Sequence, residues 1–164
     1  MTTLVQFSKN IRKRGRAIEN NASELTRRMA KQSLRALVTN TRVDTGEARS
    51  NWRVGAGSPP TAIIKPYNPY PKGSKANGQG MAENANLAAA LSVGFAKIDS
   101  IKGKAGIGLT TAIYIVNNTP QAYFMSAGGA NLAPSNFVEQ ATAAARSALR
   151  GFRITETRPQ SGGE

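Results

Sequence analysis

Side chains that commonly carry enzyme chemistry are scarce in this sequence. The 164 residues include no cysteine and no histidine, which removes thiolate nucleophiles, cysteine zinc sites and the commonest general base near neutral pH. Of the nine carboxylates, only Asp44 and Glu47 lie within three positions of each other. Their spacing is that of a helix cap, in which carboxylates bind backbone N–H groups. The sequence therefore predicts no catalytic residue, no metal site and no cofactor, and the chain is not expected to be an enzyme.

Two weaker catalytic patterns remain. Gly103, Gly106 and Gly108 are spaced like parts of a phosphate-binding loop, but the Gly-Lys-Ser/Thr ending is absent and no helix is predicted to follow. Glycines in a strand more often mark a bulge or close packing. A Ser–Lys hydrolase is the least favoured alternative, because no serine occupies a nucleophile elbow.

Positive charge is the most pronounced feature of the composition. Twenty-two Lys and Arg against nine Asp and Glu give a formal net charge of +13. Twelve of the basic residues and four of the acids lie between Lys9 and Arg53, so this third of the chain carries +8 and the remainder +5. Such a field attracts DNA, RNA or an acidic protein face. The simpler alternative is that the charge keeps the protein soluble.

Residues 4–40 are predicted to form one amphipathic helix, because apolar residues recur at spacings of three, four and seven. Gly15 and the Asn20-Asn21 pair are its weakest points, where the helix could bend or break. The apolar stripe comprises Phe7, Ile11, Ile18, Ala22, Leu25, Met29, Leu34, Leu37 and Val38. The basic residues off this stripe, which could face solvent, DNA or a partner, are Arg12, Lys13, Arg14, Arg16, Arg27, Arg28, Lys31 and Arg35.

A compact turn, Val43-Asp44-Thr45-Gly46, follows this helix. Asp44 is placed to accept a bond from a backbone N–H as a cap or an Asx turn, and Glu47 completes the spacing of a capping box. A short helical turn over residues 47–50 should follow. Residues 51–54 are then predicted to form a strand, in which Trp52 anchors the core.

A short second strand is predicted at residues 61–65, and a loop rich in proline and glycine follows at residues 66–80. This loop is either mobile or an arm that becomes ordered against a neighbouring subunit, and the sequence favours neither. The residues of such an arm would be Tyr67, Tyr70, Lys72 and Lys75.

The second half of the chain alternates helical and extended patterns. Residues 81–98 are predicted to form an alanine-rich helix, and residues 104–110 and 112–118 a β-hairpin. Residues 120–129 are predicted to be a turn region and residues 135–150 the last helix. The predicted fold class is α+β, with a long N-terminal helix and two further helices packed on a small, mostly antiparallel sheet.

The length suits one domain, predicted over residues 1–154, with a flexible polar tail at residues 155–164. No stretch approaches the roughly 20 apolar residues of a membrane span. Charged residues follow the short apolar patch at the N-terminus instead of preceding it, so no secretory signal is predicted.

Two passages taken together resemble a known family. One is the turn at residues 43–46 before a strand with Trp52, and the other runs from Ile113 to Tyr123 and on to a terminal alanine-rich helix. In this order they resemble the neck or tail-completion proteins of tailed bacteriophages, the family that includes lambda-type minor tail protein Z. The residues that carry the resemblance are Val43, Asp44, Thr45, Gly46, Trp52, Asn117, Asn118, Pro120, Ala122, Tyr123 and Pro134. Relatives usually have an acidic residue after the Ala-Tyr pair, and residues 124–129 lack it here.

The resemblance implies a structural virion protein that forms a homo-oligomeric ring at the head–tail junction. Its partners would be copies of itself, six or twelve with six favoured, a portal-side connector protein, and a tail terminator or tail tube protein. Genomic DNA would pass through the ring without sequence-specific contacts. The implied location is the virion, and the host cytoplasm during assembly, with no membrane involved. The alternative is a free nucleic-acid-binding module that uses the basic N-terminal helix.

Overall fold

The computed structural model of the protein describes residues 3–41, 46–69, 79–103, 111–128, 136–150 and 152. The elements in chain order are α1 (Leu4–Asn40), α2 (Glu47–Ser50), β1 (Arg53–Ala56), α3 (Gln79–Ser100), β2 (Ile113–Val116), α4 (Pro120–Ala127) and α5 (Phe137–Leu149). This arrangement confirms the predicted α+β class, with a long N-terminal helix and a small antiparallel sheet.

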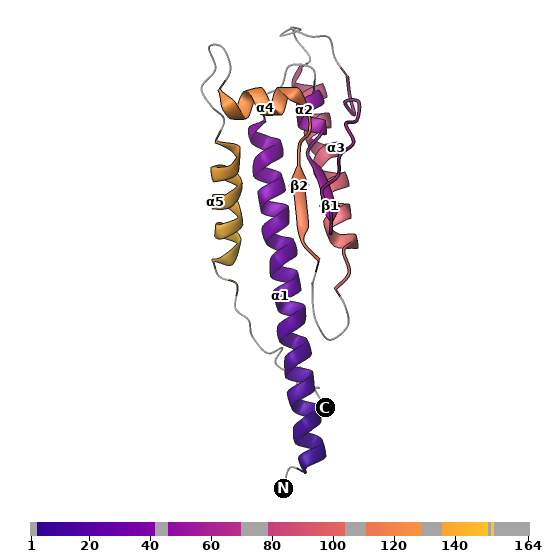
Figure 1. Ribbon diagram of the computed structural model, residues 1–164, viewed down its shortest axis with the longest axis vertical. Helices are drawn as coiled ribbons and strands as arrows, with labels where there is room; N and C mark the ends of the chain where they lie inside the picture. The colour runs from indigo at the N-terminus through magenta and orange to yellow at the C-terminus, as the bar shows by residue number, and fades with distance from the viewer. Residues whose placement is uncertain are drawn as a thin grey trace.

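Helix α1 is the axis of the molecule. Its 37 residues form one continuous helix through Gly15 and the Asn20-Asn21 pair, which corresponds to a length of about 55 Å. Thr3 caps its first turn by accepting a hydrogen bond from the backbone N–H of Gln6. The C-terminal half of α1 lies between α5 on one side and the sheet with α3 on the other (Figure 1). Its N-terminal half extends beyond the other described helices and strands (Figure 1).

The sheet pairs two strands that are distant in sequence. β1 and β2 are antiparallel, with Val54 opposite Ile115. Strand β2 lies within the predicted extended segment at residues 112–118, but its partner among the described residues is β1. The other half of the predicted hairpin, at residues 104–110, lies outside the described residues.

The predicted strand at residues 61–65 is wrong, because two buried asparagines bind this outer segment instead of a sheet neighbour. The Asn51 side chain donates to the Ile64 carbonyl at 2.8 Å and accepts from the Ile64 N–H at 2.7 Å. Asn86 binds both main-chain groups of Asn68 in the same way, each at 2.8 Å. The main-chain groups of Ile64 and Asn68 thus form hydrogen bonds with side chains instead of a strand. The buried amides of Asn51 and Asn86 gain the partners that buried polar groups require.

The predicted turn region at residues 120–129 is also wrong, because most of it forms helix α4. The Thr119 hydroxyl caps this helix, Pro120 occupies its first turn, and Gly128 ends it with a φ of 73°. Proline at the start of a helix and glycine just past its end are favourable positions for both residues. Asn117 in turn accepts hydrogen bonds from the Thr119 N–H and hydroxyl, at 3.1 and 2.8 Å.

The start of α2 differs from the predicted capping box. The N-cap residue is Gly46, with a φ of 83° and no side-chain cap bond. Asp44, the predicted cap, lies outside the described residues. Glu47 is the first helical residue, and its carboxylate accepts a hydrogen bond from the Gln121 amide at 3.1 Å. Residues 42–45, which include most of the predicted turn, lie outside the described residues.

The core consists of two apolar clusters that meet at Trp52. One comprises Leu34, Val38, Val54, Ala90 and Ile98, and the other Leu37, Ala48, Met125, Phe137 and Ala141. Trp52 packs against both clusters. Its indole N–H donates to the Thr41 hydroxyl at 2.6 Å, which satisfies the polar end of a largely apolar side chain.

Candidate partner and nucleic-acid interface

The apolar residues of α1 lie on two different faces of the helix, so the prediction of one continuous stripe is wrong. Leu34 and Val38 face the core and are fully buried. Ile18 and Leu34 are 16 positions apart, which places them about 160° apart around the helix axis. The exposed fractions in the N-terminal half are 87% for Leu4, 59% for Phe7, 50% for Ile11 and 51% for Ile18. We call the apolar residues on this outer side the outer stripe: Leu4, Phe7, Ile11, Ile18, Ala22 and Leu25.

A basic face lies opposite the outer stripe on the same part of α1. It consists of Lys9, Arg12, Lys13 and Arg16, which are exposed and line a common surface hollow. Their spacing of three, four and seven residues gathers them on one side of the helix. Arg16 and Ile18 are two positions apart and therefore point about 160° away from each other. This geometry leaves the cations free to contact phosphates while the apolar side contacts another surface.

Arg27, Lys31 and Arg35, further basic residues of α1, make contacts within the chain. Arg27 donates to the carbonyl of Ile101 at 2.8 Å, and Lys31 forms an ion pair with Asp99 at 2.7 Å. The Arg35 guanidinium lies 5.7 Å from the centre of a phenylalanine ring of α3. These contacts hold α1 to the end of α3 and give Arg27 and Lys31, which are predicted to meet DNA or a partner, a role within the chain. Arg14 and Arg28 are on the surface.

The residues predicted to form a subunit arm fall into two groups. Tyr67 packs against the core cluster around Leu34, and its N–H donates to the Ser50 hydroxyl at 3.3 Å. Residues 66–69 therefore belong to the body of the protein. The other predicted arm residues, Tyr70, Lys72 and Lys75, lie outside the described residues.

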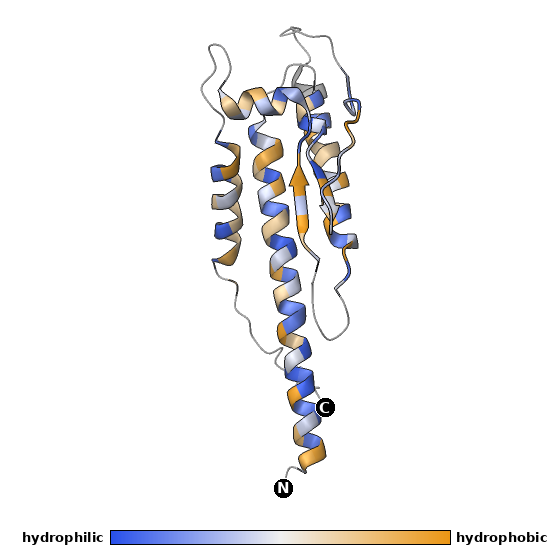
Figure 2. Cartoon of the chain, in the orientation of Figure 1, coloured by the Kyte–Doolittle hydropathy of each residue, from blue (hydrophilic) through white to orange (hydrophobic). Residues whose placement is uncertain are grey.

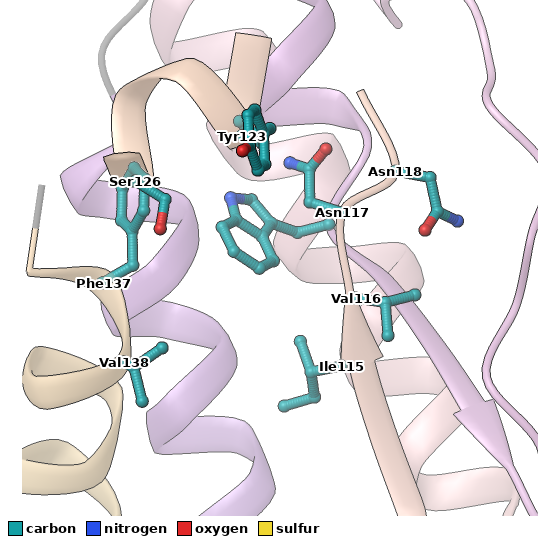
Figure 3. A pocket seen from close by; sticks show the side chains of 10 residues that line it. Ile115, Val116, Asn117, Asn118, Tyr123, Ser126, Phe137 and Val138 are labelled. Atoms are coloured by element: carbon teal, nitrogen blue, oxygen red, sulfur yellow. The ribbon is translucent and has the colours of Figure 1, made fainter. Parts of the chain in front are cut away.

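A second apolar surface lies at the opposite end of the molecule, where α4, α5 and β2 enclose a groove of about 400 Å³. Trp52 lines this groove. Tyr123, Phe137 and Ile115, which also line it, come from α4, α5 and β2 (Figure 3). Tyr123, Phe124 and Val138 are 71%, 60% and 70% exposed. No charged side chain lines the groove among the described residues. Phe124 and Val138 are not among the site residues predicted from the sequence, which interprets residues 120–129 as a turn region.

The two motif passages meet at this groove. Trp52 comes from the first passage, and Asn117, Asn118 and Tyr123 come from the second. The Asn117 amide donates to the Ala48 carbonyl at 2.7 Å, and the Asn118 amide to the Pro60 carbonyl at 2.8 Å. The asparagines therefore connect β2 to distant parts of the backbone. Pro134 lies outside the described residues.

Within the described ranges, no cluster of three His, Cys, Asp or Glu side chains could hold a metal ion. None of the helices described has the length and apolar character needed to cross a bilayer. No protein-family model, curated protein or solved structure matches this chain.

Proposed function

We propose that this chain is a structural virion protein of a tailed phage that forms a ring of identical copies at the head–tail junction. In that position it joins the portal-side connector to the tail terminator or tail tube and surrounds the path of the DNA. The order of the two sequence passages supports this proposal, and their residues meet at one groove on the folded chain.

The observation that carries the proposal is the basic face of α1. Four cations lie on one side of a helix that extends beyond the rest of the described fold. Lys9 and Arg16 are separated by about 10 Å along the helix axis. In a ring, each copy repeats this face, and the positive potentials add where the faces converge. Such a surface attracts the phosphates of any DNA sequence, as a DNA passage requires.

The apolar surface at the other end supports contact with a neighbouring protein. Tyr123, Phe124 and Val138 are mostly exposed, although each is apolar or aromatic. Exposed apolar patches of this kind are typical of protein interfaces, in which aromatic residues are enriched. The groove beside them is suited to a side chain of a connector or tail protein.

Electron microscopy tests the proposed function directly. The purified protein should form rings of six or twelve copies, and a phage that lacks the gene should accumulate DNA-filled heads and unattached tails. Supplying the gene in trans should restore joined particles, which controls for effects on neighbouring genes. Normal infectious particles without the protein would contradict the proposal.

The basic face also supports a second candidate, a free nucleic-acid-binding module. This candidate predicts that the protein binds DNA without forming rings and is absent from purified particles. Mass spectrometry of purified particles separates the two functions, because a ring subunit must be present in several copies.

A further inference from the structure

We propose that the outer stripe is a self-association surface through which two copies of α1 pair in antiparallel orientation. Leu4, Ile11, Ile18 and Leu25 recur every seven residues, as in helices that pack side by side. The first three are at least half exposed. Apolar bands recur between hydrophilic ones along this half of α1 (Figure 2). The row is about 32 Å long, and this pairing goes beyond the ring proposed above.

The order of residues in the stripe points to a second copy of the same chain. Leu-Ile-Ile-Leu reads the same in both directions, so a two-fold axis between Ile11 and Ile18 makes the stripe complementary to itself. Leu4 then lies opposite Leu25 of the second copy, and Ile11 opposite Ile18. Phe7 lies opposite Ala22, which sets a large side chain against a small one. Two-fold interfaces require this kind of self-complementarity.

Gly15 lies at the centre of this pairing. Glycine weakens the interior of a helix, and a Cβ atom at this position would meet nothing within 4 Å in its own chain. Packing within the described chain therefore does not require glycine here. The absence of a side chain at Gly15 instead allows the backbone of a second helix to approach closely at the centre of the pair.

The charge distribution favours the antiparallel orientation. From Lys9 to Arg16 the helix has five basic residues and no acidic one, whereas from Ala17 to Thr26 it has two acidic residues and no basic one. An antiparallel pair brings each basic half alongside an acidic half, with most of the cations on the far side of the helix, whereas a parallel pair brings together halves of like net charge. The basic face points away from the pair and stays open to a polyanion.

Sedimentation of the full-length protein measures the association. The wild-type protein should form dimers, or larger assemblies built from dimers. Ile11→Asp and Ile18→Asp should each weaken the association at least about a hundredfold, because each places a charge in the paired stripe. Asn20→Asp on an exposed side of the same helix is the matched control and should leave it unchanged. A monomeric wild-type protein, or equal association in all variants, would overturn the proposal.

Cysteine cross-linking tests the orientation without background, since the chain has no cysteine. A mixture of Ile11→Cys and Ile18→Cys proteins should form the mixed disulfide, and a mixture of Leu4→Cys and Leu25→Cys should do the same. Each single variant alone should form far less. Disulfides that form equally well in each variant alone would show parallel helices and overturn the antiparallel pairing. The disulfides report on the pairing of the helices alone, so the test is independent of the head–tail role.

Discussion

Buried polar side chains hold the outer segment at residues 60–69 to the core. Asn86 is fully buried in α3, where its amide binds both main-chain groups of Asn68 and its oxygen also accepts from the Ser50 hydroxyl at 3.2 Å. Three polar groups therefore depend on one side chain. Ser50 and Asn86 are fully buried whereas Asn68 is exposed, so the loss of the Asn86 side chain would remove three hydrogen bonds and take an acceptor from the buried Ser50 hydroxyl.

Asn86→Ala should lower the free energy of unfolding by roughly 1 to 3 kcal/mol, since it removes three hydrogen bonds, one of them to the buried Ser50 hydroxyl. Urea denaturation followed by circular dichroism measures the change. Asn84→Ala, at an exposed position of the same helix, is the control and should be neutral or slightly stabilising because alanine favours helix. Equal midpoints for the two variants would show that the Asn86 contacts contribute nothing.

Thr41 occupies a comparable position at the end of α1. Its hydroxyl donates to the Leu37 carbonyl at 2.6 Å and accepts from the Trp52 indole N–H at 2.6 Å. Thr41→Val keeps the shape but removes the acceptor, and should cost about 1 to 3 kcal/mol of stability. Thermal unfolding measures the stability of this variant, and Thr39→Val, at an exposed position of the same helix, is the control. A loss no greater than that of Thr39→Val would refute the role of this bond.

At the scale of elements, α1 and α3 pack tightly at Gly94, where there is no room for a side chain. A Cβ atom at Gly94 would clash with the Leu34 side chain and would contact Val54. The packing of these two helices therefore depends on the absence of a side chain at this position. Gly15, in the exposed part of α1, has open space around it in its own chain.

Gly94→Ala should destabilise the protein by about 1 to 3 kcal/mol through overpacking, although alanine is the better helix former. Gly15→Ala should not lower the stability, because nothing in the chain opposes the added methyl group. Chemical denaturation of both variants separates helix propensity from packing. A rise in stability for Gly94→Ala would mean that α1 and α3 can move apart at little cost.

At the scale of the whole molecule, the separation of a basic face from an apolar body predicts how the protein responds to salt. Each phosphate contact contributes about −0.9 to the slope of log affinity against log salt concentration for duplex DNA. Replacing Lys9, Arg12, Lys13 and Arg16 with glutamine should therefore make the slope shallower by about 3 to 4. Fluorescence anisotropy with a labelled duplex over a range of salt concentrations measures both slopes.

Arg27, Lys31 and Arg35 provide the matched control for charge. Their contacts lie within the chain, to α3, so a variant with all three replaced by glutamine should leave the slope nearly unchanged. An equal fall in slope for this variant would mean that net charge, not the basic face, governs DNA binding.

The sequence alone determined the long helices and the α+β class, because helical periodicity is a local property set by neighbours three and four positions apart. It also located Trp52 and the passage around Asn117 as features that belong together. Helix α4 was missed because Pro120 and Gly128 were interpreted as turn residues, although they occupy the two ends of a helix. The strand predicted at residues 61–65 failed because extended backbone can also bind to side chains.

Only the tertiary structure decided which side of α1 the protein covers. Periodicity shows that Ile18 and Leu34 are both apolar residues of one helix, but it carries no information about the elements that pack against them. Burial of Leu34 depends on α3 and the sheet, which come from distant parts of the chain. The pairing of β1 with β2 is likewise a contact between residues about 60 positions apart. The exposed stripe and the basic face therefore emerge as surfaces only after these long-range contacts have covered the other half of the helix.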